Sequence, residues 1–307
     1  MSSFYRLYGC TIRCDFPLPA ARPAPVGLAA DLVINWAASP TPGQAEGIQA
    51  GAGEPLLSHQ PDGAVRLVWP GEITADISGD GRAVHLQSRP EKLVFLPALA
   101  VGMILGIALH LRGTLCLHAA TLEVDGRLVG LIGDSGAGKS TLAAWLLLRG
   151  ATLYADDVTA IMPDAAGLPV VQPGPTGIRL CRDTAAALLP NTEGLANIPY
   201  PDKYLWDLSR VDAPCHDRYA RTGRALSALY WLVPGNPGEG VCVSAPLAGT
   251  AALGKLMEAS YPPMMRRMIS SGVLGGMARL AETVPVRVVR YEQAWEQLPI
   301  IERILAR

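Results

Sequence analysis

One octapeptide in this sequence carries a recognisable chemistry. Residues 133–140 read Gly-Asp-Ser-Gly-Ala-Gly-Lys-Ser, which fits the pattern G-x-x-x-x-G-K-[ST] at every fixed position. The glycines of such a loop let successive backbone N–H groups curl around phosphate oxygens, and the following helix presents its positive N-terminus. The pattern predicts a phosphate-binding P-loop in which Lys139 reaches the β- and γ-phosphates and the Ser140 hydroxyl ligates Mg²⁺. With ATP as the expected nucleotide, the predicted contacts are Gly133, Asp134, Ser135, Gly136, Ala137, Gly138, Lys139, Ser140 and Thr141.

Two adjacent aspartates, Asp156 and Asp157, follow the short apolar run Thr152–Ala155. If that run is a strand of an α/β sheet, the pair lies at its carboxyl end, where such sheets bind ligands. One carboxylate there can hold Mg²⁺ while the other accepts the proton of an attacking hydroxyl. The alternative is a pair that only caps a turn.

A histidine is placed by a predicted hairpin. Thr114–Val124 and Arg127–Ile132 are strand-like runs joined by Asp-Gly at 125–126, a strong signal for a two-residue turn. With that turn, the numbers of paired residues sum to 251, so His118 faces Gly133, the first residue of the loop. A histidine beside bound phosphates can sense or donate a proton. The alternative is a structural histidine of the strand.

The segments around these residues read as strand, glycine loop, helix and strand, so a mixed α/β sheet is predicted. The helix is Ser140–Leu148, ended by Arg-Gly at 149–150. From Pro163 to Arg224 the chain is polar and rich in Pro and Gly, which is typical of a lid or a substrate-binding segment. Further elements are expected at Ala225–Val233 (strand), Ala251–Met257 and Met264–Leu280 (helices), Val284–Tyr291 (strand) and Tyr291–Arg307 (helix).

Residues 1–90 are β-rich and hold no catalytic motif, whereas residues 91–307 hold the P-loop, so two domains with these bounds are expected. Leu96–Leu111 is an apolar helix by composition. It is shorter than the ~20 residues that a bilayer requires and contains His110, which favours a buried core helix over a membrane span. Strands are predicted at Tyr5–Ile12, Asp31–Trp36, Val65–Trp69 and Ala83–Gln87.

The composition is that of a globular protein, with 50% hydrophobic and 17% charged residues among 307. A net charge of −1 provides no global basic field to draw the chain to nucleic acid or to an anionic membrane. The six cysteines are dispersed without zinc-type spacing. The N-terminus lacks the charged and apolar regions of a signal peptide, so a cytoplasmic protein with reduced thiols is expected.

At these residues the sequence resembles the catalytic domain of HPr kinase/phosphorylase. In that family a histidine precedes a loop of the form GDSGxGKS, and an Asp-Asp pair follows the helix and an Arg-Gly. Here His118 is 21 residues before Lys139, and Asp157 is 18 residues after it. The resemblance extends from Thr114 to Ile161 and implies a P-loop kinase core of the phosphoenolpyruvate-carboxykinase-like type.

By this resemblance the chain would phosphorylate a serine of a protein, using MgATP. Asp157 would be the general base, and Ser140 and Asp156 would lie near magnesium. In the mechanism that we expect, Lys139 and the loop amides hold the phosphates, and His118 helps to offset developing charge. The stretch Arg-Thr-Gly-Arg at 221–224 looks like the arginine-bearing catalytic loop of the family, so Arg221 or Arg224 would stabilise the transferring phosphoryl group. The alternative for both arginines is a solvated basic turn.

The layout of the whole chain is closer to the HPr-kinase-like proteins encoded beside peptide natural-product pathways. The shared features are Tyr-x-x-Tyr-Gly at Tyr5–Gly9, Leu-His-Ala at 117–119, and a Pro-Gly-rich stretch leading to Ile-x-Leu at Pro173–Leu180. That stretch occupies the region in which HPr kinases carry a glutamate ligand of magnesium. Some relatives in lasso-peptide gene clusters phosphorylate a serine near the precursor's C-terminus, which implies a serine-bearing peptide or protein partner.

Three other functions fit a P-loop. A small-molecule kinase differs from the leading interpretation only in the acceptor. A mechanical or transport ATPase is disfavoured because there is no LSGGQ-like signature and the acidic pair comes one strand after the loop. A regulatory nucleotide-binding module needs no turnover. The family resemblance also allows a homo-oligomer.

Overall fold

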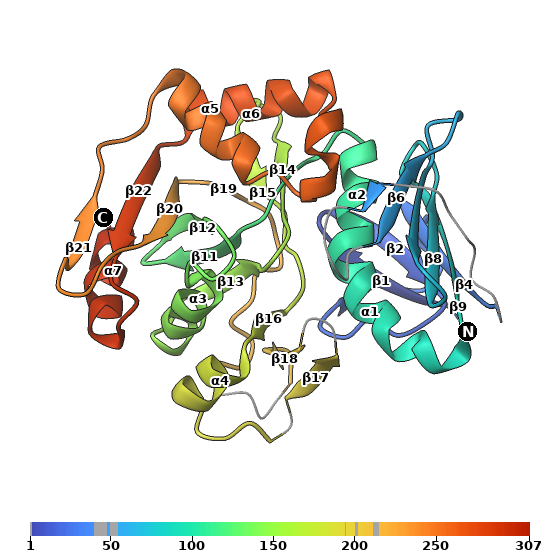
Figure 1. Ribbon diagram of the computed structural model, residues 1–307, viewed down its shortest axis with the longest axis horizontal. Coiled ribbons are helices and arrows are strands. Elements are labelled where there is room, and N and C mark those ends of the chain that lie inside the picture. The colour runs from blue at the N-terminus through green and yellow to red at the C-terminus, as the bar shows by residue number, and fades with distance from the viewer. Residues whose placement is uncertain (1, 40–47, 50–54, 194, 200–201, 211–214) are drawn as a thin grey trace.

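The computed structural model describes residues 2–39, 48–49, 55–193, 195–199, 202–210 and 215–307. Within these residues the protein is a mixed α/β structure with sheets of nine, six, four and three strands. Figure 1 shows two unequal halves, with the N-terminal sheet and the helices of residues 90–111 on the right and the rest of the chain on the left.

The nine-stranded sheet is built entirely from residues before 90, in the order β3-β1-β2-β4-β9-β8-β7-β6-β5. The prediction of one strand at Tyr5–Ile12 was wrong. The chain reverses at Tyr8 and Gly9, whose positive φ angles of 54° and 78° make the tight turn between β1 and β2. The strands are β1 (Ser3–Leu7), β2 (Cys10–Cys14), β3 (Arg22–Pro23), β4 (Leu32–Ala38), β5 (Ile48–Gln49), β6 (Leu56–His59), β7 (Val65–Trp69), β8 (Ile73–Ile77) and β9 (Ala83–Ser88).

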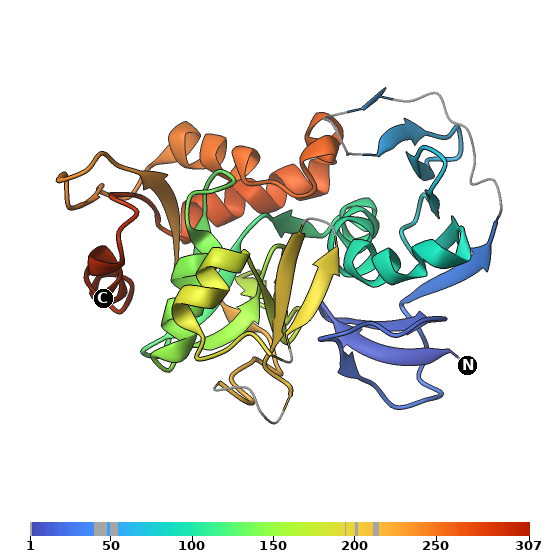
Figure 2. The ribbon, with the colours of Figure 1, turned by 60° about the horizontal axis from the view of Figure 1, so that its bottom comes forward.

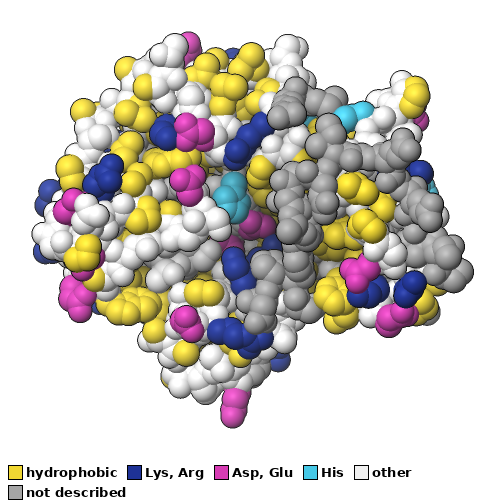
Figure 3. Space-filling model, in the orientation of Figure 1, with side chains coloured by type: hydrophobic (Ala, Val, Ile, Leu, Met, Phe, Trp, Pro, Cys, Tyr) yellow, Lys and Arg dark blue, Asp and Glu magenta, His cyan; other side chains and the backbone are white. Residues whose placement is uncertain are grey.

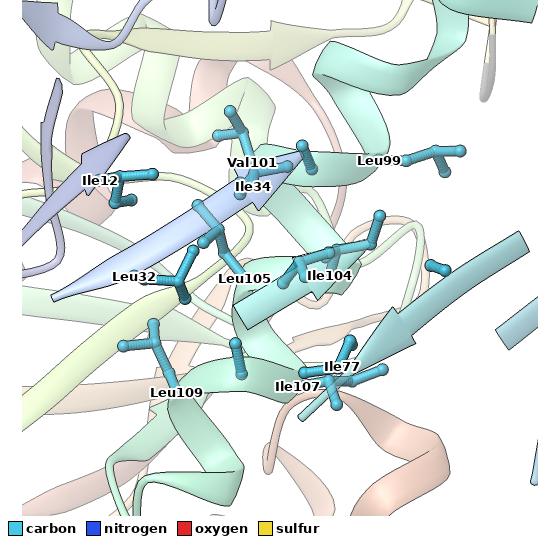
Figure 4. Close-up of a cluster of buried hydrophobic side chains, with 14 of the residues drawn as sticks. Ile12, Leu32, Ile34, Ile77, Leu99, Val101, Ile104, Leu105, Ile107 and Leu109 are labelled. Carbon is cyan, nitrogen blue, oxygen red and sulfur yellow. The ribbon is translucent and has the colours of Figure 1, made fainter. Parts of the chain in front are cut away.

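A continuous helical run at Pro90–Leu111 covers this sheet. It consists of η1 (Pro90–Phe95), α1 (Leu96–Leu99), a π-helical turn η2 (Ala100–Ile104) and α2 (Leu105–Leu111). Its 22 residues are long and apolar enough to cross a membrane, so the argument from length was wrong, yet 61% of its most apolar window is buried. Figure 4 shows why: Ile104 and Leu105 pack among Ile12, Leu32 and Ile77 of the sheet. The run is a core helix whose partner is the N-terminal sheet.

The six-stranded sheet, in the order β13-β11-β12-β20-β22-β21, has helices on both faces. Along β12, Val129 and Leu131 share a core with α3 and α7, while Leu128 and Ile132 share another with α5 and α6. This alternation is what a strand buried on both faces requires. The elements are β11 (Ala120–Val124), β12 (Arg127–Ile132), β13 (Thr152–Ala155), β20 (Ala228–Pro234), β21 (Val241–Val243), β22 (Val286–Tyr291), α3 (Lys139–Leu148), α5 (Gly249–Glu258), α6 (Ser271–Thr283) and α7 (Leu298–Leu305).

Two small sheets complete the fold. Residues predicted as one strand at Thr114–Val124 form β10 and β11 in different sheets, and the helix predicted at Met264–Leu280 is divided into η3 and α6. Figures 1 and 2 both place the yellow strands β17 and β18 between α4 and the N-terminal half. The elements are β10 (Leu115–Leu117), β14 (Thr159–Pro163), β15 (Pro169–Val171), β19 (Arg224–Ala225), β16 (Gly177–Leu180), β17 (Ala196–Pro199), β18 (Asp202–Asp207), α4 (Arg182–Leu188), η3 (Pro263–Met268) and η4 (Trp295–Gln297).

Candidate active site

The predicted phosphate-binding loop joins β12 to α3, and two of its positions require glycine. Gly133 and Gly138 have φ angles of 140° and 87°, outside the range that side chains favour. A Cβ atom at Gly133 would lie 2.6 Å from the Leu232 carbonyl oxygen, and one at Gly138 would lie 2.2 Å from the Tyr291 hydroxyl. The Lys139 ammonium donates to the carbonyl oxygens of Gly133 (2.7 Å) and of the next residue (3.0 Å). The lysine is thus held against the loop.

Three chain segments converge at one edge of the six-stranded sheet. β11 lies between β12 and β13 and runs antiparallel to both, so these two strands end at the edge where β11 begins. The loop follows β12 there, Asp156 and Asp157 follow β13, and His118 precedes β11. One cleft is therefore lined by His118, by both aspartates and by most of the predicted loop residues, namely Ser135, Gly136, Gly138, Lys139, Ser140 and Thr141; Gly133, Asp134 and Ala137 are not part of its lining.

His118 reaches the cleft by a different route from the predicted one. The hairpin register is confirmed, because paired residues from Val124 and Arg127 to Ala120 and Leu131 sum to 251. The ladder ends at Ala120, however, so His118 does not pair with Gly133. Its backbone N–H donates instead to the Ala259 carbonyl oxygen (2.7 Å). At this point the chain passes from the four-stranded sheet to the six-stranded sheet. A prediction of one continuous strand at Thr114–Val124 did not allow for this change.

The His118 ring is held between Asp157 and Tyr261. Its Nδ1 atom lies 3.1 Å from the Asp157 carbonyl oxygen and 3.2 Å from the Asp157 Oδ1 atom. Because a carbonyl oxygen can only accept, Nδ1 carries the proton in this contact. The Tyr261 ring stacks on the imidazole at a centroid distance of 5.9 Å and an angle of 18°. These contacts orient His118 toward Asp157.

Asp157 is at a tight reversal. Its φ of 69° is positive, and the Val158 N–H donates to the Asp156 carbonyl oxygen (2.8 Å), which closes a three-residue turn. Non-glycine residues with such φ values are uncommon and cluster at functional sites. The turn directs the chain from β13 into β14 and leaves the Asp157 carboxylate at the cleft.

Arg179, in the middle of β16, is the site residue that sequence reasoning missed. Its Nη1 atom donates to the Asp157 Oδ2 atom (3.0 Å), its Nη2 atom donates to the Ala98 carbonyl oxygen (3.0 Å), and its backbone N–H donates to the Asp156 Oδ2 atom (2.9 Å). One residue thus contacts both aspartates. Its only sequence signal was a charged residue between Ile178 and Leu180, which indicates no partner. It lies in the region where the family resemblance places a glutamate.

The two aspartates differ in their electrostatics. Burial raises the pKa of Asp156 to about 6, although the Arg179 N–H opposes this. Burial also raises the pKa of Asp157, but the Arg179 guanidinium and His118 more than offset it and hold that pKa well below its usual range. Burial lowers the pKa of Lys139, with the two nearby aspartates opposing. Asp157 is therefore the firmly ionised member of the pair.

Arg221 and Arg224 are not brought to this site, and neither lines the cleft. Arg224 forms an ion pair with Glu123 (2.5 Å) and donates to the Gly126 carbonyl oxygen, at the end of the hairpin opposite the loop. Arg221 forms an exposed ion pair with Asp217 (2.6 Å). The prediction that one of them contacts the transferring phosphoryl group does not fit this arrangement. Lys203 of β18 lines the cleft instead, and its charge helps to lower the pKa of both adjacent aspartates.

Ser140 and Asp156, the predicted magnesium ligands, both line the cleft. A hydroxyl and a carboxylate are the hard oxygen donors that Mg²⁺ prefers, with phosphate and water in the remaining positions. In the described residues there is no group of three His, Cys, Asp or Glu side chains that could hold a metal. The donor set therefore fits an ion shared with a phosphate ligand rather than one held by protein alone.

The cleft has a volume of about 800 Å³, within the ~300–1,000 Å³ of small-molecule sites. Figure 3 shows histidine, acidic and basic side chains gathered at a hollow near the centre of the displayed face. A second pocket, of about 120 Å³, shares Ala98, Asp156, Asp157 and Arg179 with the cleft. It is mostly apolar and includes Tyr8 of the N-terminal sheet, so both halves of the chain contribute to the surroundings of Asp157.

No family model matches this chain, and no curated protein matches it significantly. Among solved structures, it is similar to the HPr(Ser) kinase/phosphatase from Coxiella burnetii, with 12% sequence identity and a TM-score of 0.36. That match covers 62% of this chain and 93% of the other. A likeness at this level carries no argument about activity, so the function proposed below rests on the residues of the cleft.

Proposed function

We propose that this protein is an ATP-dependent kinase that transfers the γ-phosphoryl group to a serine hydroxyl of a peptide or protein. The observation that carries the proposal is the convergence of Lys139, Asp157 and His118 on one cleft. Lys139 belongs to a loop whose sequence is suited to phosphates, and Asp157 is a carboxylate suited to an acceptor hydroxyl. A binding module without turnover would need the loop but not the oriented His118–Asp157 pair.

In the proposed reaction the acceptor oxygen attacks the γ-phosphorus, the bond to the β-phosphate oxygen breaks, and the hydroxyl proton passes to the Asp157 carboxylate. Phosphoryl transfer goes through a loose transition state, so the protein mainly positions the reactants and stabilises charge. A carboxylate with a depressed pKa is a weak base, which suits an acceptor that loses its proton late. His118, held by its Nδ1 proton, orients that carboxylate.

Charge on the transferring group would be offset by cations that line the cleft. Lys139 and Lys203 are the two lysines there, and Arg179 holds Asp157 from the other side. Ser140 and Asp156 would hold Mg²⁺, which neutralises phosphate oxygens when bound. Donors fixed in place before reaction contribute more than mobile ones, because no reorganisation is needed in the transition state.

For the acceptor we propose a serine-bearing peptide, with a lasso-peptide precursor carrying serine near its C-terminus as the first class to test. The proposal is supported by the family resemblance and by the second pocket beside Asp157, whose apolar lining could receive a side chain next to the serine. A small-molecule alcohol is the competing acceptor, and the two are separated by the labelled product.

The test is transfer of radiolabel from γ-labelled ATP, with Mg²⁺, to peptides ending in serine and to a panel of small alcohols. Labelled peptide that disappears with Lys139→Ala and with Asp157→Asn supports the proposal. Asn is the matched change at 157 because it also tolerates a positive φ. ATP hydrolysis that labels no acceptor and is indifferent to Asp157→Asn would contradict it.

A further inference from the structure

Trp295 is a large apolar side chain that remains in solvent although the core lies close by. It is 44% exposed, in the short helix η4 between β22 and α7, and it lines the cleft. Its neighbour Leu298, only 4% exposed, also lines the cleft and is anchored in the core beneath α3. An exposed indole on the wall of a cleft is a flat surface available to a ligand.

The segment that carries Trp295 is fastened to the predicted phosphate-binding loop. The Tyr291 hydroxyl donates to the Ala137 carbonyl oxygen (2.8 Å), and the Gln293 Nε2 atom donates to the Gly136 carbonyl oxygen (2.6 Å). Both bonds come from residues just before Trp295. They hold the segment that carries Trp295 beside the loop.

The charged residues proposed for acceptor chemistry and the uncharged lining residues of the C-terminal segment line different parts of the cleft. His118 and Asp157 are on the segments beside β11 and β13, where the acceptor chemistry was proposed, and Arg179 of β16 contacts Asp157 there. The C-terminal segment contributes no charged side chain to the lining, which there consists of Tyr291, Gln293, Ala294, Trp295 and Leu298. Thr141, at the start of α3, belongs to the same cleft.

We propose that Trp295 is the platform on which the base of the bound nucleotide stacks, with Ala294 and Leu298 completing an apolar base subsite. This inference rests on the proposed function for the phosphates of that nucleotide and adds the site of its base. Stacking on an aromatic side chain recognises a base by its π face. The subsite therefore favours purines, which have the larger face, over pyrimidines.

The test compares a ligand that has a base with one that has none, by calorimetric titration of the full-length protein with MgATP and with magnesium tripolyphosphate. Trp295→Ala is expected to weaken MgATP binding by about 5- to 150-fold, the range for one stacked base, and to leave tripolyphosphate binding unchanged. Trp295→Phe, which keeps an aromatic face, is the matched control and is expected to restore most of the affinity. CTP is expected to bind the wild-type protein more weakly than ATP.

The outcomes separate this inference from the proposed function. Equal weakening of both ligands by Trp295→Ala, or no weakening of either, overturns the base platform and leaves the phosphate site standing. Lys139→Ala is expected to weaken both ligands. If it leaves both affinities unchanged, the phosphate site fails, and the base platform that depends on it fails as well.

Discussion

Arg179 and Asp157 form a largely buried ion pair, with 3.0 Å between Nη1 and Oδ2, and each has a second partner that fixes it. The arginine also donates to the Ala98 carbonyl oxygen, and the aspartate also contacts His118. The pair joins the helix that covers the N-terminal sheet to the strand ends of the six-stranded sheet. It therefore links the two halves of the chain at the carboxylate proposed as the base.

Arg179→Met is expected to lower the free energy of unfolding by about 3 kcal/mol, near the low end for a broken buried pair, because His118 still contacts Asp157. The loss arises because a carboxylate that is only 24% exposed loses its main counter-charge. Urea unfolding at neutral pH measures it. Arg179→Lys should recover part of the loss, since an ammonium keeps the charge but cannot contact Asp157 and Ala98 with one planar group.

Phosphotransfer provides the second readout for this arginine. Replacing it should raise the pKa of Asp157 and so shift the pH profile of kcat/KM upward, whereas a purely structural loss would leave the profile in place. An Arg179→Met protein with wild-type stability and an unshifted profile would show that the ion pair does not hold Asp157.

Asp156 should make the protein less stable as the pH rises through about 6. Its pKa is raised to about 6 in the folded protein, so the folded state binds more protons than the unfolded state between the unfolded value, ~3.9, and 6. Stability is lost over that interval. The free energy of unfolding of Asp156→Asn, relative to that of wild type and without Mg²⁺, should therefore rise by up to about 3 kcal/mol between acid and neutral pH. Urea unfolding at each pH measures it.

Asp157 supplies the control, because its shift has the opposite sign. A depressed pKa contributes stability that is present above the unfolded value and is lost as the pH falls toward the folded value. The loss in free energy of unfolding caused by Asp157→Asn should therefore be largest at neutral pH and become smaller in acid. If the free energies of unfolding of the two asparagine variants changed with pH in the same way, both pKa assignments would be contradicted.

The sequence predicted the local elements of the site better than the tertiary contacts between them. β7 and β13 were predicted to the residue, and the Asp125-Gly126 turn set the hairpin register correctly, because each depends on neighbouring residues only. His118 was paired with the wrong residue because the chain passes from the four-stranded to the six-stranded sheet before Ala120. Backbone contacts of residues 116–118 with residues 259–261 accompany this change. Period-two patterns do not record such a change.

The cations show the same limit. Arg221 and Arg224 were predicted because residues 221–224 resemble the arginine-bearing loop of the family, yet they pair with Asp217 and Glu123 outside the cleft. Arg179 and Lys203 reach the cleft through a three-stranded sheet that no local pattern indicated. A buried arginine is recognisable only once its remote partner is known. The exposure of Trp295 is likewise a property of the folded surface.

Replacing Lys203 and replacing Arg224 are expected to affect phosphotransfer activity differently. Lys203→Ala should lower kcat/KM for phosphotransfer on the order of 100-fold, the loss seen when one fixed charge-stabilising donor is removed. Arg224→Ala should keep activity within about threefold of wild type, since Arg224 lies outside the cleft and its partly exposed ion pair with Glu123 contributes little. Initial rates with labelled ATP compare them. A severe loss for Arg224→Ala with an unaffected Lys203→Ala would restore the role for Arg224 that the family resemblance implies.

Gly138 and Tyr291 should be coupled, because the only space for a side chain at 138 is taken by the tyrosine hydroxyl. Gly138→Ala places Cβ 2.2 Å from that oxygen but 3.5 Å from the ring carbon that bears it. The variant should displace the loop and lower kcat/KM by up to about 100-fold. Tyr291→Phe alone loses one hydrogen bond to the Ala137 carbonyl oxygen, worth about 1 kcal/mol.

In the double variant the missing hydroxyl leaves room for the new methyl group. Gly138→Ala/Tyr291→Phe should therefore be more active and more stable than Gly138→Ala, with a favourable coupling of at least about 1 kcal/mol in the double-mutant cycle. A remaining deficit of ~1–2 kcal/mol is expected from a non-glycine residue at a φ of 87°. Additive effects would mean that backbone conformation alone requires glycine, and that the contact with Tyr291 adjusts at no cost.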